Sequence, residues 1–222
     1  MPAKNRARTL KMVGIENPDK QMHHRDENDL MFSHPSVVLL CGSRNSGKGN
    51  TVKMIIAQKE PAFQRIVCWH LDPTGTKEWL DVDAEMTAEL PDHDFFDREK
   101  INLLICDEQD LLGMSKKQRG AFDRLVSYDA THKSLSIYIC QQNVTNCPPS
   151  VRRACDYICY WPGIDRCAQE YMTRLTGHSI KQLKRLCETR YDFLCFDFGG
   201  IGPELRLNIF EPINIAESDD ED

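Results

Sequence analysis

The chain has 222 residues, of which 41% are hydrophobic and 28% charged, and its formal net charge is −6. This length allows one α/β domain with a buried sheet but not two ordinary domains with linkers, and the composition excludes a disordered or membrane-embedded chain. The negative charge argues against a surface that coats nucleic acid everywhere, although it leaves room for a local basic lining.

Two features indicate an intracellular protein. The longest apolar runs, such as Val37–Cys41 and Leu103–Cys106, are far shorter than the roughly 20 residues of a membrane span, so we expect no span. The start of the chain also lacks the charged and then apolar layout of a signal peptide. The ten cysteines include no pair separated by two residues, so we expect small buried thiols in a reducing compartment rather than zinc ligands or disulfides.

Hydrophobic patterning divides the chain into three parts. Residues 1–30 are polar and mixed in charge, and we expect a mobile N-terminal arm there. Residues 213–222 end in ESDDED and predict an acidic C-terminal tail exposed to solvent. Between them, residues 31–212 form the predicted domain.

Short aliphatic runs alternate with longer amphipathic segments along the domain, which predicts a mainly parallel sheet flanked by helices. Strands are expected at Ser36–Cys41, Arg65–Leu71, Asn102–Cys106, Leu135–Cys140, Asp156–Tyr160 and Phe193–Asp197, with Leu205–Phe210 as a candidate for the final edge strand. Helices are expected at Lys48–Gln58, Lys116–Ser127, Pro149–Ala154, Asp165–Thr176 and Ile180–Glu188.

The segment from Gly42 to Gly49, GSRNSGKG, predicts a phosphate-binding loop because it directly follows an apolar strand and directly precedes a helix. Glycines at both ends let the backbone curl so that successive amide groups point at phosphate oxygens, and the helix adds its positive N-terminal end. Lys48 supplies a mobile positive charge for the β- and γ-phosphates. The predicted nucleotide-binding residues are Gly42, Ser43, Arg44, Asn45, Ser46, Gly47, Lys48, Gly49 and Asn50.

One position departs from the usual pattern of such loops. Where GxxxxGK[ST] carries a hydroxyl that binds Mg²⁺, this chain has Gly49. Two interpretations are open: either the metal is held through water and the acidic end of a strand, or the loop is a weakened version. Cradling of phosphate by the backbone does not use that side chain.

The aliphatic strand 101–106 ends in two carboxylates, Asp107 and Glu108. We predict that Asp107 holds Mg²⁺ and that Glu108 polarises the attacking water. An ordinary boundary between a strand and a loop is the alternative. A whole strand, Arg65–Leu71, lies between the loop helix and this pair, which favours the RecA-like P-loop branch with an additional strand and a catalytic glutamate. The chain lacks an Asn-Lys-x-Asp guanine motif, so we expect the nucleotide to be ATP with Mg²⁺.

Polar residues also end the strand Leu135–Cys140, with Gln141 first. Ligands in such sheets bind at the carboxyl ends of the strands, so Gln141 is predicted to face the γ-phosphate and to orient water. A surface glutamine without a role is the alternative. Lys48, Glu108 and Gln141 are therefore the predicted catalytic residues.

Four segments together, GSRNSGKG, LLICDE, THKSLSIYICQQN and PPSVRRACDYI, resemble the genome-packaging ATPases of large DNA viruses, the poxvirus-like branch of the FtsK–HerA superfamily of P-loop NTPases. The resemblance covers about Ser36 to Tyr160. Members of that family typically carry a His before the fourth strand, a Gln at its end and a Pro-x-x-x-Arg segment, which correspond here to His132, Gln141 and Pro148 with Arg152.

The resemblance implies a homo-oligomeric ring, a pentamer or hexamer, that moves double-stranded DNA into a viral capsid through a capsid or portal-vertex protein. It places the protein in the infected host cell at the site of virus assembly, with association with the virion as an alternative. A trans-acting arginine finger is not assigned. Another FtsK–HerA-type motor of conjugation or plasmids, or a nucleotide-gated interaction protein with weak turnover, is the alternative function. Candidates for the finger are Arg119, Arg124, Arg152 and Arg153.

Overall fold

The computed structural model describes residues 32–163, 165–198, 204–208 and 211–212. The predicted arm, residues 1–30, and the predicted acidic tail, residues 213–222, lie outside the described residues.

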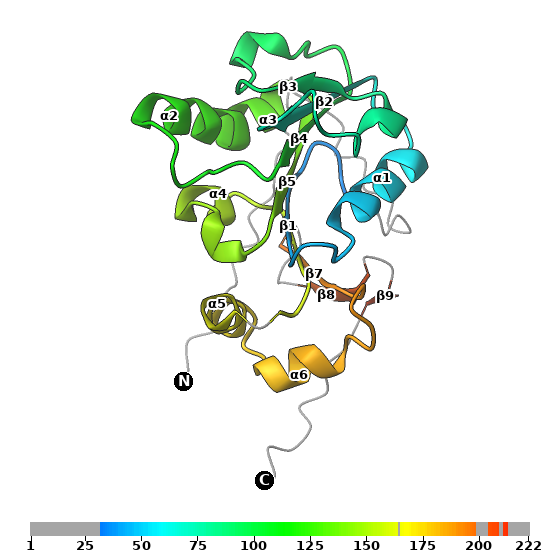
Figure 1. Ribbon diagram of the computed structural model, residues 1–222, viewed down its shortest axis with the longest axis vertical. Helices are drawn as coiled ribbons and strands as arrows, with labels where there is room; N and C mark the ends of the chain where they lie inside the picture. The colour runs from blue at the N-terminus through cyan, green and yellow to red at the C-terminus, as the bar shows by residue number, and fades with distance from the viewer. Residues whose placement is uncertain (1–31, 164, 199–203, 209–210, 213–222) are drawn as a thin grey trace, which may run out of the picture.

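The described strands form one nine-stranded sheet in the order β3-β2-β4-β5-β1-β6-β7-β8-β9, with helices on both sides (Figure 1). The pairs from β3 to β6 are parallel, and those from β6 to β9 are antiparallel. The strands are β1 (Val37–Cys41), β2 (Arg65–His70), β3 (Glu85–Thr87), β4 (Asn102–Asp107), β5 (Leu135–Gln141), β6 (Tyr157–Tyr160), β7 (Leu194–Asp197), β8 (Glu204–Leu207) and β9 (Glu211–Pro212).

This order confirms the predicted fold class. β5 lies between β1, which leads into the glycine-rich loop, and β4, which ends at the acidic pair. β1 therefore has a middle position with an additional strand beside it. The sheet is mainly parallel, as the alternation of strands and helices predicted.

The helices follow the predicted ranges closely, and Lys48–Gln58 matches at both ends. The α-helices are α1 (Lys48–Gln58), α2 (Lys116–Arg124), α3 (Ala130–His132), α4 (Pro149–Arg153), α5 (Arg166–Thr176) and α6 (Ile180–Arg185). A π-helical turn, η3 (Leu125–Asp129), joins α2 to α3, so the helical segment runs past the predicted end at Ser127. In the part of the chain that the structure describes, the short 3₁₀ helices are η1 (Leu80–Val82), η2 (His93–Phe95) and η4 (Val144–Asn146).

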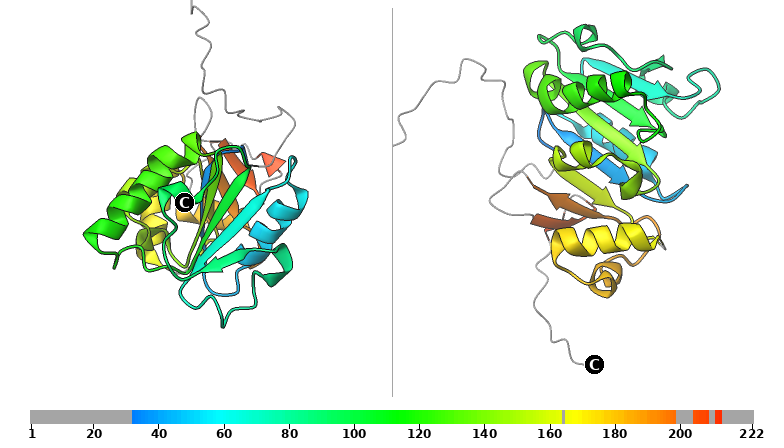
Figure 2. Two further views of the ribbon diagram at one scale, coloured as in Figure 1. Left: turned by 90° about the horizontal axis from the view of Figure 1, so that it is seen from above. Right: turned by 90° about the vertical axis from the view of Figure 1, so that its left-hand side faces the viewer.

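Apolar side chains on both faces of the sheet form two cores. Val37, Leu39 and Cys41 of β1 belong to one cluster, and Val38 and Leu40 belong to the other. Successive residues of a strand point to opposite faces, so a continuous apolar run buries both sides of a parallel sheet. Helix α1 covers one face, whereas α2, α4, α5 and α6 pack on the other (Figure 2).

Two strands differ from the expectation. The three-residue β3 was not predicted, because it is too short for an alternating pattern. The predicted final strand Leu205–Phe210 is observed as Glu204–Leu207, and β9 rather than this strand lies at the edge among the described residues. Both differences lie away from the centre of the sheet.

The parallel register brings the strand ends that carry the predicted site to one edge. Cys41 pairs with Gln141, Cys140 pairs with Asp107, and Asp107 also pairs with His70. The glycine-rich loop therefore starts beside Gln141, and the acidic pair lies one strand further along. A cleft for a ligand is expected at this edge.

Candidate nucleotide-binding site

The loop between β1 and α1 curls back on itself. Its first amide, Gly42 N, donates to the Gln141 carbonyl at 3.1 Å, and Ser46 N donates to the Ser43 carbonyl at 3.3 Å. Asn45 has φ 58° and Gly47 has φ 103°, both in the left-handed region. Glycine adopts this region without the clash that a side chain causes, so the second glycine of the motif is needed at this turn.

Helix α1 begins at Lys48 with the features of an anion site. No side chain caps its first turn, and no acidic residue lies there. Backbone amides at the start of a helix lack partners within the helix, and the helix dipole adds positive potential. The start of α1 is therefore suited to a phosphate group.

The Lys48 side chain is buried and folds back under the loop. Its Nζ donates to the carbonyl oxygens of Gly42 at 2.8 Å and of Ser43 at 3.1 Å. An ammonium group has three donors, so one donor is left for a phosphate oxygen. The two carbonyls hold this charge at the mouth of the loop.

Asp107 ends β4 as a buried carboxylate across from the loop. The Trp79 Nε1–H donates to its Oδ2 at 2.8 Å. Burial raises the pKa of the Asp107 carboxyl, and the charge of Glu108 adds to this, while the bond from Trp79 opposes it. A cation next to Asp107 would offset the cost of its charge.

Glu108 follows with φ 51°, a left-handed conformation that is uncommon for a residue with a side chain and recurs at functional sites. Its amide donates to the Cys140 carbonyl at 3.3 Å, which continues the ladder to β5 for one more residue. The strand therefore ends at the turn at Glu108, and the chain leaves the edge of the sheet there.

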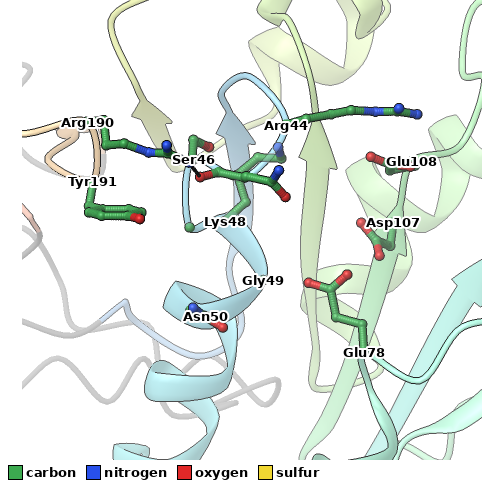
Figure 3. A pocket seen from close by; sticks show the side chains of 12 residues that line it. Arg44, Ser46, Lys48, Gly49, Asn50, Glu78, Asp107, Glu108, Arg190 and Tyr191 are labelled. Carbon is green, nitrogen blue, oxygen red and sulfur yellow. Dashed lines mark hydrogen bonds between the residues drawn. The ribbon is translucent and has the colours of Figure 1, made fainter.

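A pocket of about 580 Å³ joins the loop and the acidic pair. In Figure 3 the loop and Lys48 lie in the middle, Asp107, Glu108 and Glu78 on one side, and Arg190 and Tyr191 on the other. A triphosphate along the loop would have the acids at one end and an aromatic ring at the other. The lining residues are Arg44, Asn45, Ser46, Gly47, Lys48, Gly49, Asn50, Glu78, Asp107, Glu108, Arg190 and Tyr191.

Several solved structures share this arrangement of strands and helices. The genome packaging NTPase B204 from Sulfolobus turreted icosahedral virus 2, solved in complex with AMPPCP, matches with a TM-score of 0.57 and 18% identity over 77% of this chain and 97% of that chain. The DNA-packaging ATPase B204 from Sulfolobus turreted icosahedral virus matches with a TM-score of 0.59 and 15% identity over 81% of this chain and 98% of that chain.

The chain has the fold of a P-loop NTPase.

A third P-loop NTPase structure, the pCW3 conjugation coupling protein TcpA with ATPγS, matches with a TM-score of 0.53 and 14% identity, over 81% of this chain but only 60% of TcpA. The resemblance to viral packaging and conjugation NTPases is thus confirmed at the level of fold. No protein-family model matches the sequence, and no curated protein matches it either. Within the described ranges, no helix has the length and apolar composition of a membrane span.

Most of the predicted site residues come together in the pocket. Residues 44–50 line it with Asp107 and Glu108. Gly42 and Ser43 are not lining residues, but their carbonyls hold Lys48 from behind. The prediction from the sequence therefore located both the loop and the acidic pair, and their roles stay predictions.

Gln141 lies differently from the expectation. Its buried side chain donates from Nε2 to the Gln109 carbonyl at 2.9 Å. It lines a second pocket of about 340 Å³ next to the first, and Glu108 lines both. Gln141 is thus placed to act on the segment that carries Glu108, and direct contact with the γ-phosphate stays a prediction.

Three lining residues were missed from the sequence: Glu78, Arg190 and Tyr191. Glu78 lies in the segment that follows β2. Because ligands bind near the carboxyl ends of parallel strands, the segment after a predicted strand was an available signal. Arg190 and Tyr191 precede an antiparallel strand, where no local pattern indicates a ligand site. Arg190 donates from Nη2 to the Asn45 carbonyl at 2.7 Å, which fixes this segment against the phosphate loop.

Glu78 is exposed as a residue, while its carboxyl group extends into the pocket toward Asp107 (Figure 3). Partial burial raises the pKa of this carboxyl, and the charge of Asp107 raises it further, against a smaller opposing effect of Lys53. Two carboxylates therefore face the same pocket and disfavour each other's charge.

The donor set fits Mg²⁺ bound together with a nucleotide. Among the described residues, no three His, Cys, Asp or Glu side chains converge to form a metal centre of their own. Mg²⁺ in phosphate-binding sites is usually held by one or two carboxylates, phosphate oxygens and water, rather than by a cage made only of protein groups. Asp107 and Glu78 supply carboxylates of this kind beside the loop.

Proposed function

We propose that this chain is an ATP-hydrolysing, DNA-translocating motor that packages viral double-stranded DNA into a capsid. The observation that carries the proposal is that Lys48, the start of α1 and the pair Asp107–Glu108 line one pocket. A basic loop supports binding of phosphates, and an acid beside it supports hydrolysis. Binding alone would need only the loop.

The chain's own groups account for the steps of phosphoryl transfer. The loop amides and Lys48 would hold the β- and γ-phosphates and offset their charge. Glu108 would accept hydrogen bonds from a water molecule and orient it in line with the bond to be broken. When bound, Mg²⁺ would neutralise charge on the same phosphates, with Asp107 as one of its protein ligands.

The comparisons support a motor of the packaging type. The two B204 structures match over nearly their whole length, and those proteins are a genome packaging NTPase and a DNA-packaging ATPase. Double-stranded DNA, a capsid or portal-vertex protein and further copies of this chain are the proposed partners, in the infected cell or associated with the virion. The arginine-finger candidates Arg119, Arg124, Arg152 and Arg153 do not line the pocket of their own chain, which accords with a ring in which a neighbour supplies the finger.

A motor of the conjugation type is the second candidate. It is favoured by the match to TcpA and by the GKG sequence of the loop, which resembles that of conjugative coupling proteins. Both candidates are ATP-driven DNA motors. They differ in the larger assembly to which the ring would bind, a viral capsid in the first case and a conjugation apparatus in the second.

The proposal is tested by phosphate release from ATP by the full chain, with and without linear duplex DNA, alongside the particle mass with ATPγS. We expect duplex DNA to stimulate hydrolysis and the nucleotide to favour a ring. Displacement of a triplex-forming oligonucleotide from the duplex would report translocation. Tight ATP binding without phosphate release under any of these conditions would contradict the motor and favour a nucleotide-gated interaction protein.

A further inference from the structure

Gly49 leaves a space that another segment of the chain fills. It is the second residue of α1 and stands where related loops carry the hydroxyl for Mg²⁺. A side-chain carbon at Gly49 would lie 1.9 Å from Glu78 Oε1 and 3.0 Å from Glu78 Cδ. The carboxylate of Glu78 therefore occupies the place of the missing side chain (Figure 3).

The segment that carries Glu78 is held on two sides. The next residue, Trp79, is fully buried in the core between α1 and the sheet, and its indole donates to Asp107 Oδ2 at 2.8 Å. Two residues further on, Asp81 forms an ion pair with Lys53 of α1 at 2.9 Å. These contacts attach the segment to both β4 and α1, so the position of Glu78 follows from packing around it.

No basic side chain among the described residues forms an ion pair with the Glu78 carboxylate. Lys53 pairs with Asp81, and Lys48 donates to the loop carbonyls. Glu78 and Asp107 thus lie on the same side of the loop in one pocket, and neither forms an ion pair with a basic side chain among the described residues. A divalent cation is the ligand that would balance this charge beside a triphosphate.

We propose that Glu78 replaces the missing hydroxyl of the phosphate loop as a side-chain ligand of the Mg²⁺ that accompanies ATP. This inference rests on the proposed nucleotide-binding function and adds a residue that the loop sequence does not reveal. A carboxylate brings a full negative charge where a hydroxyl is neutral. Without metal it repels the triphosphate, and with metal it strengthens the bridge between protein and nucleotide.

One consequence distinguishes this role from a structural one. Nucleotide binding by this chain depends on Mg²⁺ more steeply than it does for a loop with a hydroxyl. Removing the charge in Glu78→Gln should therefore weaken binding with Mg²⁺ and leave binding without metal unchanged or tighter. If Glu78 made a purely structural contact, Glu78→Gln would change nucleotide binding with Mg²⁺ and without Mg²⁺ in the same direction.

The test is calorimetric titration of the full-length protein with ATPγS at a series of Mg²⁺ concentrations and in EDTA. For Glu78→Gln we expect the Mg²⁺ concentration for half-saturation to rise at least about tenfold, as for the loss of a group that supports a metal site. Asp83→Asn removes an exposed acid that follows the same segment and does not line the pocket, so it serves as the matched control, with little change expected. Mn²⁺ in place of Mg²⁺ gives a second readout, because its electron paramagnetic resonance signal reports bound metal directly.

An exchange of the two positions makes the test reciprocal. In the Glu78→Ala background, Gly49→Ser has space for its hydroxyl. The double variant should therefore need less Mg²⁺ for half-saturation with ATPγS than Glu78→Ala alone. Gly49→Ser in the native background should bind Mg²⁺ less well, because the serine displaces the carboxylate. Recovery in the double variant also shows that the chain folds without the Glu78 side chain.

The outcomes separate this inference from the proposed function. If the native chain binds ATPγS with Mg²⁺ and Glu78→Gln leaves the Mg²⁺ dependence unchanged, the role of Glu78 is wrong and the function stands. If Glu78→Gln tightens binding equally with and without metal, Glu78 only obstructs the pocket and the inference is also wrong. If the native chain binds no nucleotide, both fail.

Discussion

Trp79 and Asp107 are joined by a buried hydrogen bond, from the indole Nε1–H to the carboxylate Oδ2 at 2.8 Å. The bond connects the segment after β2 with the end of β4 and uses one oxygen of the carboxylate. Because the indole is fixed in the core, the second oxygen of Asp107 has a defined direction. This relationship links the stability of the core to the geometry of the predicted metal site.

Replacing Trp79 with phenylalanine should therefore reduce both stability and metal-dependent binding. Trp79→Phe keeps a smaller aromatic ring but removes the donor to a buried charge, and the loss of that donor costs about 1.5–3 kcal/mol of unfolding free energy. Denaturant unfolding and ATPγS titration with Mg²⁺ measure the two effects. Trp69→Phe is the control, because the Trp69 indole donates to the neutral Ala88 carbonyl; it should cost less and leave nucleotide binding unchanged. Equal effects of the two variants would contradict the role of Trp79.

Lys48→Ala should remove most nucleotide binding. The ammonium group is the charged donor at the mouth of the loop, and a hydrogen bond to a charged group contributes about 1.5–3 kcal/mol, or roughly 10- to 100-fold in affinity. Calorimetry with ATPγS measures the change. Lys117→Ala, at an exposed lysine on α2 that does not line the pocket, is the control and should bind normally. Native affinity in Lys48→Ala would show that the loop does not hold the phosphates.

Glu108→Gln should stop hydrolysis and spare binding. The amide keeps the shape of the side chain but cannot accept a proton from water, and general base catalysis contributes about 10²- to 10⁴-fold. Phosphate release under single-turnover conditions and ATPγS affinity together separate the two effects. The control is Glu170→Gln, which removes an acid on α5 paired with Arg166. Normal turnover in the Glu108→Gln protein would remove Glu108 from the catalytic role.

Gln141→Ala should slow turnover with near-normal affinity for ATP. Its amide donates to the Gln109 carbonyl, so its loss frees the backbone next to Glu108 without touching the phosphate loop. Rates of phosphate release at saturating ATP measure the effect. Gln142→Ala changes the exposed neighbour in the same second pocket and should be silent. Unchanged kinetics in Gln141→Ala would show that this buried side chain has no role in turnover.

Tyr191→Ala should weaken binding of ATP but not of inorganic triphosphate. The ring is 60% exposed at the end of the pocket away from the acids (Figure 3), where a base can stack on it. Stacking of a base on an aromatic ring is worth about 1–3 kcal/mol, so we expect about a tenfold loss of ATP affinity. Tyr128→Ala, at an exposed tyrosine stacked on His132, is the control. An equal loss of triphosphate affinity would indicate that Tyr191 supports the loop rather than the base.

Local patterns in the sequence were sufficient for the centre of the fold and for most of the loop. The apolar run of β1, the glycines of the loop and the start of α1 follow one another along the chain, and the turns of the loop and helix form hydrogen bonds within a few residues, such as Ser46 N to the Ser43 carbonyl and Thr51 N to the Gly47 carbonyl. Asp107 and Glu108 were predicted because polar residues that end a buried parallel strand lie at a shared edge. Such features depend on short-range geometry, so a single sequence reveals them.

Only the tertiary structure decided what surrounds that loop. Glu78 fills the space left by Gly49 because Trp79 is buried beneath it, and Tyr191 reaches the pocket because Trp161 and Arg190 hold its segment against the loop. Gln141 bonds to the segment after β4 because β4 and β5 are paired in register. These contacts join segments far apart in the chain, and they form because burying large apolar side chains on both faces of one sheet leaves each segment a single place to pack.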